Sequence, residues 1–429
     1  MKEIKINHVD EVIYVDETKE GMPIYMWVNE KVNNFYMTLN VKYGSIDTEF
    51  KLKGDKKYTK VPSGVAHFLE HVTFNEEDNS SAFDYFKQFG SSINAFTSFD
   101  ITAYEVMGSS KFSENLNHLL DYVFTPYMTK GNVEKEKGII VEEISMGDNQ
   151  PGRRLFFGVY ESLFQVNKRK FSIAGTKESV KETTLEDLVL VYNNFYHPKN
   201  MFVVITGNFN PYEASALIKE NLGIKSFPEY RDPIKKRDKE PLEVVSKKKD
   251  IPANIEIPKL RIALKIPRKK FREKNDLKLE MGLGIVLSTN FGFTSDLREE
   301  LMAQELVNSM GFSREIIDDY MIVGISAETK YLSEVTDRFI NKLNELSISK
   351  ETLIRRRKSS IANMVLAYDN IELINNEIQD NIMTYDEIIT DRYDMLKKLS
   401  INDLNDIIDD LDTSNMMVVR MVPNPDKDN

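Results

Sequence analysis

Two histidines four residues apart, in the segment His67-Phe68-Leu69-Glu70-His71, constrain the local fold of this chain. On a helix, residues at this spacing lie about one turn apart on one face, so both imidazoles can reach a single metal ion. Glu70 lies beside His71 in the sequence, near enough to the same face to hold a water next to that metal. The segment therefore predicts a helix that carries two metal ligands and a general base.

The order of these residues is specific, because His-x-x-Glu-His is the inverted form of the zinc-peptidase signature. The chain of 429 residues contains only 5 histidines. A chance match is therefore expected on the order of once in a hundred sequences. An amphipathic helix with two surface histidines and one glutamate is the alternative interpretation. We predict a metal-dependent hydrolase.

Two histidines do not complete a catalytic zinc site, which normally has three protein ligands and a fourth position for water. A predicted helix over residues 132–146 offers Glu136 and Glu143. They are seven residues apart, a spacing that returns a helix to within about 20° of its starting direction. One of the pair can bind the metal while the other orients a ligating imidazole. A solvated acidic face that includes Glu134 and Glu142 is the alternative interpretation.

The residue types of this constellation indicate amide hydrolysis. Zinc lowers the pKa of a bound water and polarises a carbonyl group. Glu70 is placed to take the proton of that water and pass it to the leaving amine. The chain contains no cysteine, so thiolate zinc sites and disulfide frameworks are excluded. We expect one zinc ion per chain, held by histidine and carboxylate.

Composition excludes several other classes of protein. The net charge of -11 argues against nucleic acid as a main partner. No apolar run approaches the length needed to span a bilayer, so we expect no membrane partner. Residues 1–7 contain no apolar signal core, and we expect a cytoplasmic protein.

Strand-like and helical stretches alternate along the chain, whose length suggests more than one domain. In the first half we predict strands at 33–43, 101–107 and 200–206, and helices from 62–63 through the histidine motif and at 80–89, 112–124 and 132–146. In the second half we predict strands at 260–266, 321–326 and 416–422, and helices at 276–288, 295–307 and in several later stretches. The similar order indicates an α+β fold with two similar halves.

Residues 223–250 lack sustained periodicity and contain three prolines and two clusters of basic residues. Such a stretch is typical of an exposed linker, and a nucleic-acid patch is the less favoured alternative. We predict an N-terminal catalytic zinc-binding domain (1–222), a linker (223–254) and a C-terminal homologous domain (255–429). The C-terminal domain has no such metal site, since no histidine follows His197.

The block Val61-Pro62-Ser63-Gly64-Val65-Ala66-His67-Phe68-Leu69-Glu70-His71 resembles the pitrilysin/insulinase family of zinc metallopeptidases. That family includes mitochondrial processing peptidase and half-length bacterial members. Residues 92–98 are similar to its Asn-Ala-x-Thr segment, 133–144 to its distal glutamate helix, and 195–201 to its Tyr-x-Pro-x-Asn-Met stretch. The resemblance is specific over roughly residues 20–210.

The resemblance implies two α+β halves, each an antiparallel sheet flanked by helices, joined by a linker. Two such units enclose a chamber. The metal ligands would be His67, His71 and Glu143. Glu70 would be the general base, and Glu136 would orient a ligand.

The resemblance also implies a peptide substrate that pairs with the strand from Asn94 to about residue 104. We therefore expect Asn94, Ala95, Phe96 and Thr97 to bind substrate. Strand addition uses backbone hydrogen bonds, so it selects extended peptides. For Asn94, an ordinary turn residue is the alternative interpretation.

The chain departs from the family in its second half. Family active sites usually include an arginine and a tyrosine seven residues apart, but here Leu297-Arg298 is followed by Glu305 at the tyrosine position. Arg298 is a candidate substrate-binding residue, and a solvated helix residue is the alternative. We expect a hetero-oligomer with a related subunit that supplies the Arg/Tyr pair, or else a homodimer.

The leading interpretation is a zinc endopeptidase that cleaves peptides or unfolded segments inside a closed chamber. A dedicated peptidase that trims the leader of one precursor is the first alternative. A catalytically inactive assembly subunit of the same fold is the second. The joint presence of His67, Glu70, His71 and Glu143 favours the enzyme, because loss of activity usually removes one of them.

Overall fold

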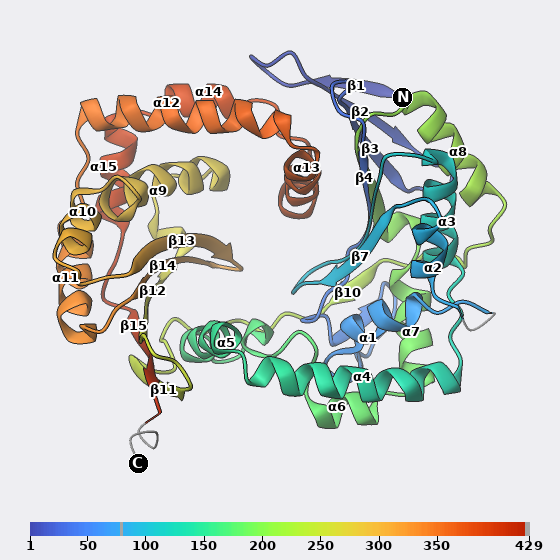
Figure 1. Ribbon diagram of the computed structural model, residues 1–429, viewed down its shortest axis with the longest axis horizontal. Coiled ribbons are helices and arrows are strands. Elements are labelled where there is room, and N and C mark those ends of the chain that lie inside the picture. The colour runs from blue at the N-terminus through green and yellow to red at the C-terminus, as the bar shows by residue number, and fades with distance from the viewer. Residues whose placement is uncertain (78–79, 425–429) are drawn as a thin grey trace. The chain divides into compact units, whose positions relative to one another are not determined.

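The computed structural model describes residues 1–77 and 80–424 (Figure 1). It divides into two compact units, which are described separately here. Unit 1 comprises Met1–Met146, Ser172–Arg237 and Met364–Asp391. Unit 2 comprises Gly147–Phe171, Asp238–Asn363 and the described chain from Arg392 onward. The last five residues of the predicted domain 255–429 lie outside the described part.

Unit 1 contains a seven-stranded sheet and a smaller three-stranded one. The order of the large sheet is β1 (Lys2–Lys5), β2 (Val12–Glu17), β3 (Pro23–Val28), β9 (Met201–Gly207), β4 (Phe35–Val41), β8 (Thr102–Gly108) and β7 (Ser92–Thr97). The small sheet is β10 (Pro233–Lys235), β5 (Glu49–Leu52) and β6 (Thr59–Lys60). In the large sheet every neighbouring pair is antiparallel except β3 and β9.

Helices cover both faces of the large sheet. They are α1 (Val65–Thr73), α2 (Ala82–Lys87), α3 (Phe112–Phe124), α4 (Lys130–Asp148), α6 (Lys177–Glu182), α7 (Leu185–Phe195), α8 (Pro211–Gly223) and α13 (Ile371–Tyr385), with short 3-10 turns at η2 (Pro198–Asn200) and η4 (Ala367–Asp369). One face packs Met37 and Val203 against α1, α3, α7 and α8. The other packs Phe202 and Val204 against α13. This double cover explains why every residue of β4 and β9 is buried.

Unit 2 contains a five-stranded sheet in the order β11 (Lys248–Ala253), β15 (Met416–Pro423), β12 (Lys259–Pro267), β14 (Tyr320–Glu328) and β13 (Ser309–Ile317). Only β11 and β15 run parallel. Its helices are α5 (Pro151–Leu163), α9 (Asp276–Phe291), α10 (Asp296–Ala303), α11 (Leu332–Asn344), α12 (Lys350–Leu366), α14 (Arg392–Lys398) and α15 (Ile401–Asp410), with 3-10 turns at η1 (Lys168–Lys170) and η3 (Arg268–Lys270). In the described residues, no helix combines the length and apolar character needed to cross a membrane.

The predicted α+β fold with two helix-flanked sheet halves is confirmed, with one parallel strand pair in each main sheet. Two segments pack outside the half in which chain order places them. Helix α5 contributes Leu155 and Leu163 to a core with β15 of unit 2. Helix α13 contributes Ile374 and Ile378 to a core with β3 and β9 of unit 1. Apolar periodicity identifies a buried helix face but not the sheet that covers it, so the boundaries 1–222 and 255–429 stay a prediction.

Several predicted elements differ in extent. The predicted helix 295–307 ends at Ala303, and the following strand β13 was not predicted, since Ser309–Ile317 has no clear alternation of apolar residues. The predicted helix 80–89 is shorter, because the Ser81 side chain caps α2 at Phe83 N. The predicted helix 112–124 is confirmed as α3.

The predicted linker 223–254 contains two strands, β10 and β11. Its first basic cluster is paired with acidic residues. Lys235 Nζ lies 2.8 Å and Arg237 Nη2 2.5 Å from the buried carboxylate of Asp47, and Lys236 Nζ lies 2.7 Å from Glu49. This cluster therefore contributes to the packing of unit 1 and is not a free cationic patch.

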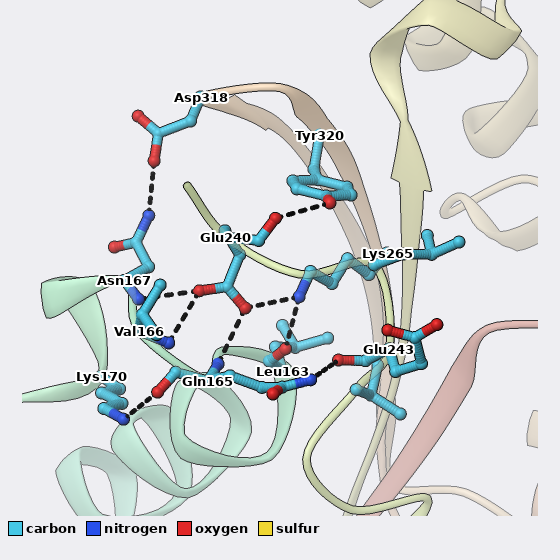
Figure 2. A network of polar contacts seen from close by, with 12 residues as sticks. Leu163, Gln165, Val166, Asn167, Lys170, Glu240, Glu243, Lys265, Asp318 and Tyr320 are labelled. Atoms are coloured by element: carbon cyan, nitrogen blue, oxygen red, sulfur yellow. Dashed lines mark hydrogen bonds and ion pairs between the residues drawn. The ribbon is translucent and has the colours of Figure 1, made fainter. Parts of the chain in front are cut away.

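A buried ion pair between Lys265 and Glu240 holds the part of the predicted linker around Glu240 in place (Figure 2). Lys265 Nζ lies 2.7 Å from Glu240 Oε1, and the two side chains are 0% and 2% exposed. Three successive backbone N–H groups, of Gln165, Val166 and Asn167, donate to the same carboxylate at 2.8–2.9 Å. These donors and the ammonium keep the pKa of Glu240 below its ordinary value although burial opposes the charge.

Two more bonds tie this pair to its surroundings. Lys265 Nζ donates to Leu163 O at 3.0 Å, and the Tyr320 hydroxyl donates to Glu240 O at 2.9 Å. The Lys265–Glu240 pair therefore joins four elements: the end of α5, strand β12, strand β14 and the predicted linker.

We predict that Lys265→Met destabilises the protein by about 3 to 5 kcal/mol, because it leaves the Glu240 carboxylate buried without its cation. The matched control is Lys270→Met, which removes the partly exposed partner of Asp412. This control should cost at most about 1 kcal/mol. Denaturant unfolding of the three proteins measures both values, and an equal loss in the two variants would contradict the prediction.

Candidate metal centre

Helix α1 is placed by its buried face and by the glycine before it. Phe68, Leu69 and Val72 are fully buried in the core of unit 1. Gly64 has φ 89°, and a Cβ at this position would lie 2.3 Å from Ala174 O. The helix therefore begins at Val65, slightly later than predicted, with a residue before it that only glycine fits.

The opposite face of α1 carries the two histidines. The His67 and His71 rings lie with centroids 4.7 Å apart. Glu143 of α4 approaches both, with Oε2 3.8 Å from His67 Nε2 and 3.3 Å from His71 Nε2. One ligand atom from each of the three residues lies within 4.8 Å of the other two. The structure thus brings together a possible metal-binding group of two imidazoles and one carboxylate.

The structure gives Glu136 and Glu143 different contacts, which their spacing in the sequence could not assign. Glu136 is buried, and its Oε2 lies 3.3 Å from His71 Nδ1, on the side of the ring away from Glu143. Burial alone would lower the pKa of His71, but the hydrogen bond to Glu136 and the charges of Glu143 and Glu70 outweigh it and raise that pKa. Glu136 is therefore placed to orient the His71 ring, while Glu143 faces both Nε2 atoms.

Glu70 lies on the same face of α1 and is partly buried. The Thr97 hydroxyl donates to Glu70 Oε2 at 2.6 Å. Burial raises the pKa of Glu70, while the Thr97 hydrogen bond and the charge of His71 oppose part of that rise. The Thr97 hydroxyl thus holds the carboxylate beside the histidines.

Strand β7, which carries Asn94, Ala95, Phe96 and Thr97, is the last strand of its sheet. It pairs with β8 on one side, and no strand pairs with its other side among residues 1–77 and 80–424. Such an edge presents unpaired backbone groups to a further strand. Asn94 is therefore a strand residue and not a turn residue, and its amide donates to Glu105 at 3.5 Å.

A cavity of about 460 Å³ adjoins this cluster. Its walls come from α1, α2, β7, α4 and the segment that joins α1 to α2. They include the cluster residues, Glu136, Asn94 and Ala95, together with the apolar side chains of Phe74, Phe83 and Ile139. Space for a ligand thus lies directly beside the two histidines and the edge strand.

Arg298 lies on α10 in unit 2. Its Nη1 donates to Met310 O at 2.7 Å, and its guanidinium lies 4.9 Å from the centre of the Phe293 ring. Glu305 lies beyond the end of the helix with φ 56°, so it does not share a helix face with Arg298. The predicted helix 295–307, which would have contained both positions, ends at Ala303.

Sequence reasoning did not identify the hydroxyl groups that hold the end of α1. Thr73 Oγ1 donates to Leu69 O at 2.6 Å and accepts from the Tyr104 hydroxyl at 3.2 Å. Tyr104 OH lies 2.9 Å from Tyr196 OH. These residues come from separate elements, and no motif in the sequence joins them.

Comparison with known proteins agrees with the fold and identifies the family. Residues 53–177 match the family profile described as Insulinase (Peptidase family M16), and residues 182–359 match the profile of the Peptidase M16 inactive domain. The uncharacterized zinc protease YmfH of Bacillus subtilis is 32% identical over 429 residues, which covers 99% of each chain. Zinc protease PqqE of Helicobacter pylori is 28% identical over 65% of this chain and 63% of its own.

Solved structures show the same architecture. The crystal structure of an M16-like protein from Alicyclobacillus acidocaldarius has a TM-score of 0.90 at 26% identity and covers 97% of this chain and 99% of its own. That of a protease from Helicobacter pylori has a TM-score of 0.82 at 18% identity, covering 96% and 99%. The fold is that of a protein with two sheet-containing units like those of M16-like structures. The chain belongs to the peptidase M16 (insulinase) family, and the predicted resemblance is confirmed.

We predict that Gly64→Ala destabilises unit 1 by more than about 1 kcal/mol, because alanine is strained at positive φ and its Cβ meets Ala174 O. The matched control is Gly138→Ala in α4, where a Cβ meets nothing within 4 Å. That change should stabilise the helix by about 0.5 to 1 kcal/mol. Thermal unfolding compares the variants, and a Gly64→Ala protein as stable as the wild type would contradict the account of α1.

Proposed function

We propose that this protein is a zinc-dependent endopeptidase that hydrolyses peptides or unfolded polypeptide segments. The observation that carries the proposal is the group of His67, His71 and Glu143 within 4.8 Å, with Glu70 beside it and an unpaired strand edge next to it. Relatives named zinc proteases support the same activity. The predicted cytoplasmic location stays a prediction.

The donor set fits one zinc ion per chain. Two imidazoles and one carboxylate form a common catalytic zinc site, which leaves a fourth position open. With bonds of about 2.0 Å in a tetrahedron, ligand atoms lie about 3.3 Å apart. The separations of 3.3 and 3.8 Å from Glu143 Oε2 to the two Nε2 atoms are close to that value. Because Glu136 faces Nδ1 of His71, the Nε2 atom of that ring remains for the metal.

In the proposed mechanism, His67, His71 and Glu143 would hold a zinc ion, which would lower the pKa of a water and polarise the carbonyl group of the substrate. Glu70 accepts the proton of the attacking water and delivers it to the leaving amine. Glu136 fixes the ring orientation of His71, as carboxylates commonly do for ligating histidines. The edge of β7 pairs with the backbone of an extended peptide and sets it across the site.

In this proposal Asn94, Ala95 and Phe96 of the edge strand bind substrate, and Arg298 of unit 2 stays a predicted substrate-binding residue. The absence of a tyrosine at position 305 supports a hetero-oligomer with a related subunit that brings the Arg/Tyr pair, and a homodimer is the alternative. Robust peptide cleavage by a strictly monomeric preparation would count against any such partner.

Two alternatives remain within the same fold. One is a dedicated peptidase that trims the leader of one precursor. A relative named as a processing peptidase, the mitochondrial-processing peptidase subunit beta of Blastocladiella emersonii, is 29% identical over 40% of this chain and 37% of its own. An inactive assembly subunit is the other alternative. One cluster contains the four predicted residues His67, Glu70, His71 and Glu143. This favours the enzyme over an inactive subunit.

We predict that Glu70→Gln lowers kcat/KM for a mixed peptide pool by about 10²- to 10⁴-fold, because the amide cannot accept the proton of the water. Zinc content should not change, since Glu70 is not one of the three proposed ligands. Mass spectrometry of the products and metal analysis of the same samples test both statements. Unchanged cleavage in this variant would exclude the proposed mechanism.

A second prediction concerns metal binding. Glu143→Gln should weaken zinc affinity at least about 10-fold, because it removes the charged ligand. Glu142→Gln changes the neighbouring exposed glutamate and should leave the affinity unchanged. Competition with a chromophoric chelator measures both dissociation constants. Equal affinities in the two variants would place the metal elsewhere.

A further inference from the structure

The hydroxyl of Thr97 donates a hydrogen bond to Glu70. Its oxygen lies 2.6 Å from Glu70 Oε2, the length of a strong bond between a hydroxyl and a carboxylate. A hydroxyl has one proton, so while Thr97 donates to Glu70 it cannot also donate to a peptide. The hydroxyl therefore has a contact separate from the backbone pairing with substrate that is predicted for this strand, and that pairing stays a prediction.

The direction of the side chain follows from its strand. Side chains alternate along β7, so Ile93, Ala95 and Thr97 share one face. Ile93 and Ala95 pack in the same core as the buried face of α1. Thr97 therefore points toward α1, while the backbone edge of β7 lies at right angles to it, in the plane of the sheet.

The backbone of Thr97 is held by the neighbouring strand. Thr97 pairs with Thr102 of β8, which is fully buried and donates its hydroxyl to Tyr43 O at 3.0 Å. On one side, Thr97 is thus fixed to the sheet through its backbone. Through its side chain it holds the carboxylate of a helix.

We infer that Thr97 is a positioning residue that links the peptide-pairing edge of β7 to the orientation of the general base Glu70. This inference rests on the proposed function. When an extended peptide pairs with β7, it restrains the strand, and the Thr97 hydroxyl transmits that restraint to the Glu70 carboxylate. Binding energy from peptide residues far from the cleaved bond then appears as a higher kcat and not only as a lower KM.

The first test compares Thr97→Val, which keeps the branched shape but removes the donor, with Thr97→Ser, which keeps the donor. Thr97→Val should lower kcat about 10- to 100-fold with KM and zinc content unchanged. Thr97→Ser should retain kcat within a few-fold. Thermal unfolding of each variant shows whether it is folded. A kcat unchanged in Thr97→Val would overturn the inference.

A second test uses peptides of increasing length that share one cleavage site. In the wild type, kcat should rise with length, and in Thr97→Val this rise should be lost. A direct substrate contact is tested in the Glu70→Gln background, where peptide affinity is measured without turnover. Equal affinity with and without Thr97→Val supports the positioning role, and weaker binding with Thr97→Val would overturn it.

If the wild type cleaves no peptide, the proposed function fails, and the inference is then tested by structure. Crystal structures of the wild type and of Thr97→Val show the Glu70 carboxylate directly. A carboxylate that shifts or loses its single orientation in the variant supports the positioning role. One that stays in place in the variant would overturn it.

Discussion

The site depends on one imidazole that two carboxylates hold from opposite sides. Glu143 lies 3.3 Å from Nε2 of His71, and Glu136 lies 3.3 Å from Nδ1. Both glutamates belong to α4 and are two turns apart, so a single helix sets both contacts. A shift of α4 by one residue would turn both carboxylates about 100° away. The relative placement of α1 and α4 within unit 1 therefore determines the ring orientation, and with it the geometry of the whole cluster.

That placement originates in the buried side of α1 and not in the histidines and glutamates of the cluster. Helix α1 is fixed at its start by Gly64, where no other residue fits, and along its length by buried Phe68 and Val72. Its end is fixed by the Thr73 hydroxyl, which Tyr104 contacts from β8. These contacts hold the helix that carries the two histidines. A preorganised cluster of this kind needs little rearrangement on binding a metal, which is how rigid elements support a site.

The sequence predicts which residues of this site share a helix face. It does not predict the contacts between elements that are far apart in the chain. The spacing of His67 and His71 predicts a shared helix face, and the spacing of Glu136 and Glu143 predicts a second, because both depend on helix period alone. Which glutamate faces which nitrogen depends on how two helices meet, and spacing cannot show that. The bond from Thr97 to Glu70 joins residues 27 positions apart through side chains, and no periodicity reports it. Chain order likewise does not show where α5 and α13 pack, since an apolar helix face does not identify the sheet that it covers.

X-ray absorption at the zinc edge, combined with metal analysis of the purified protein, tests the central claim most directly. The account predicts one zinc ion per chain, with two imidazole nitrogens at about 2.0 to 2.1 Å and one carboxylate oxygen at about 2.0 to 2.2 Å. It also predicts that the imidazole signal is lost in a protein in which His67 and His71 are replaced. A bound zinc ion with a different ligand set, or one that remains bound in the same way after that replacement, would contradict the account.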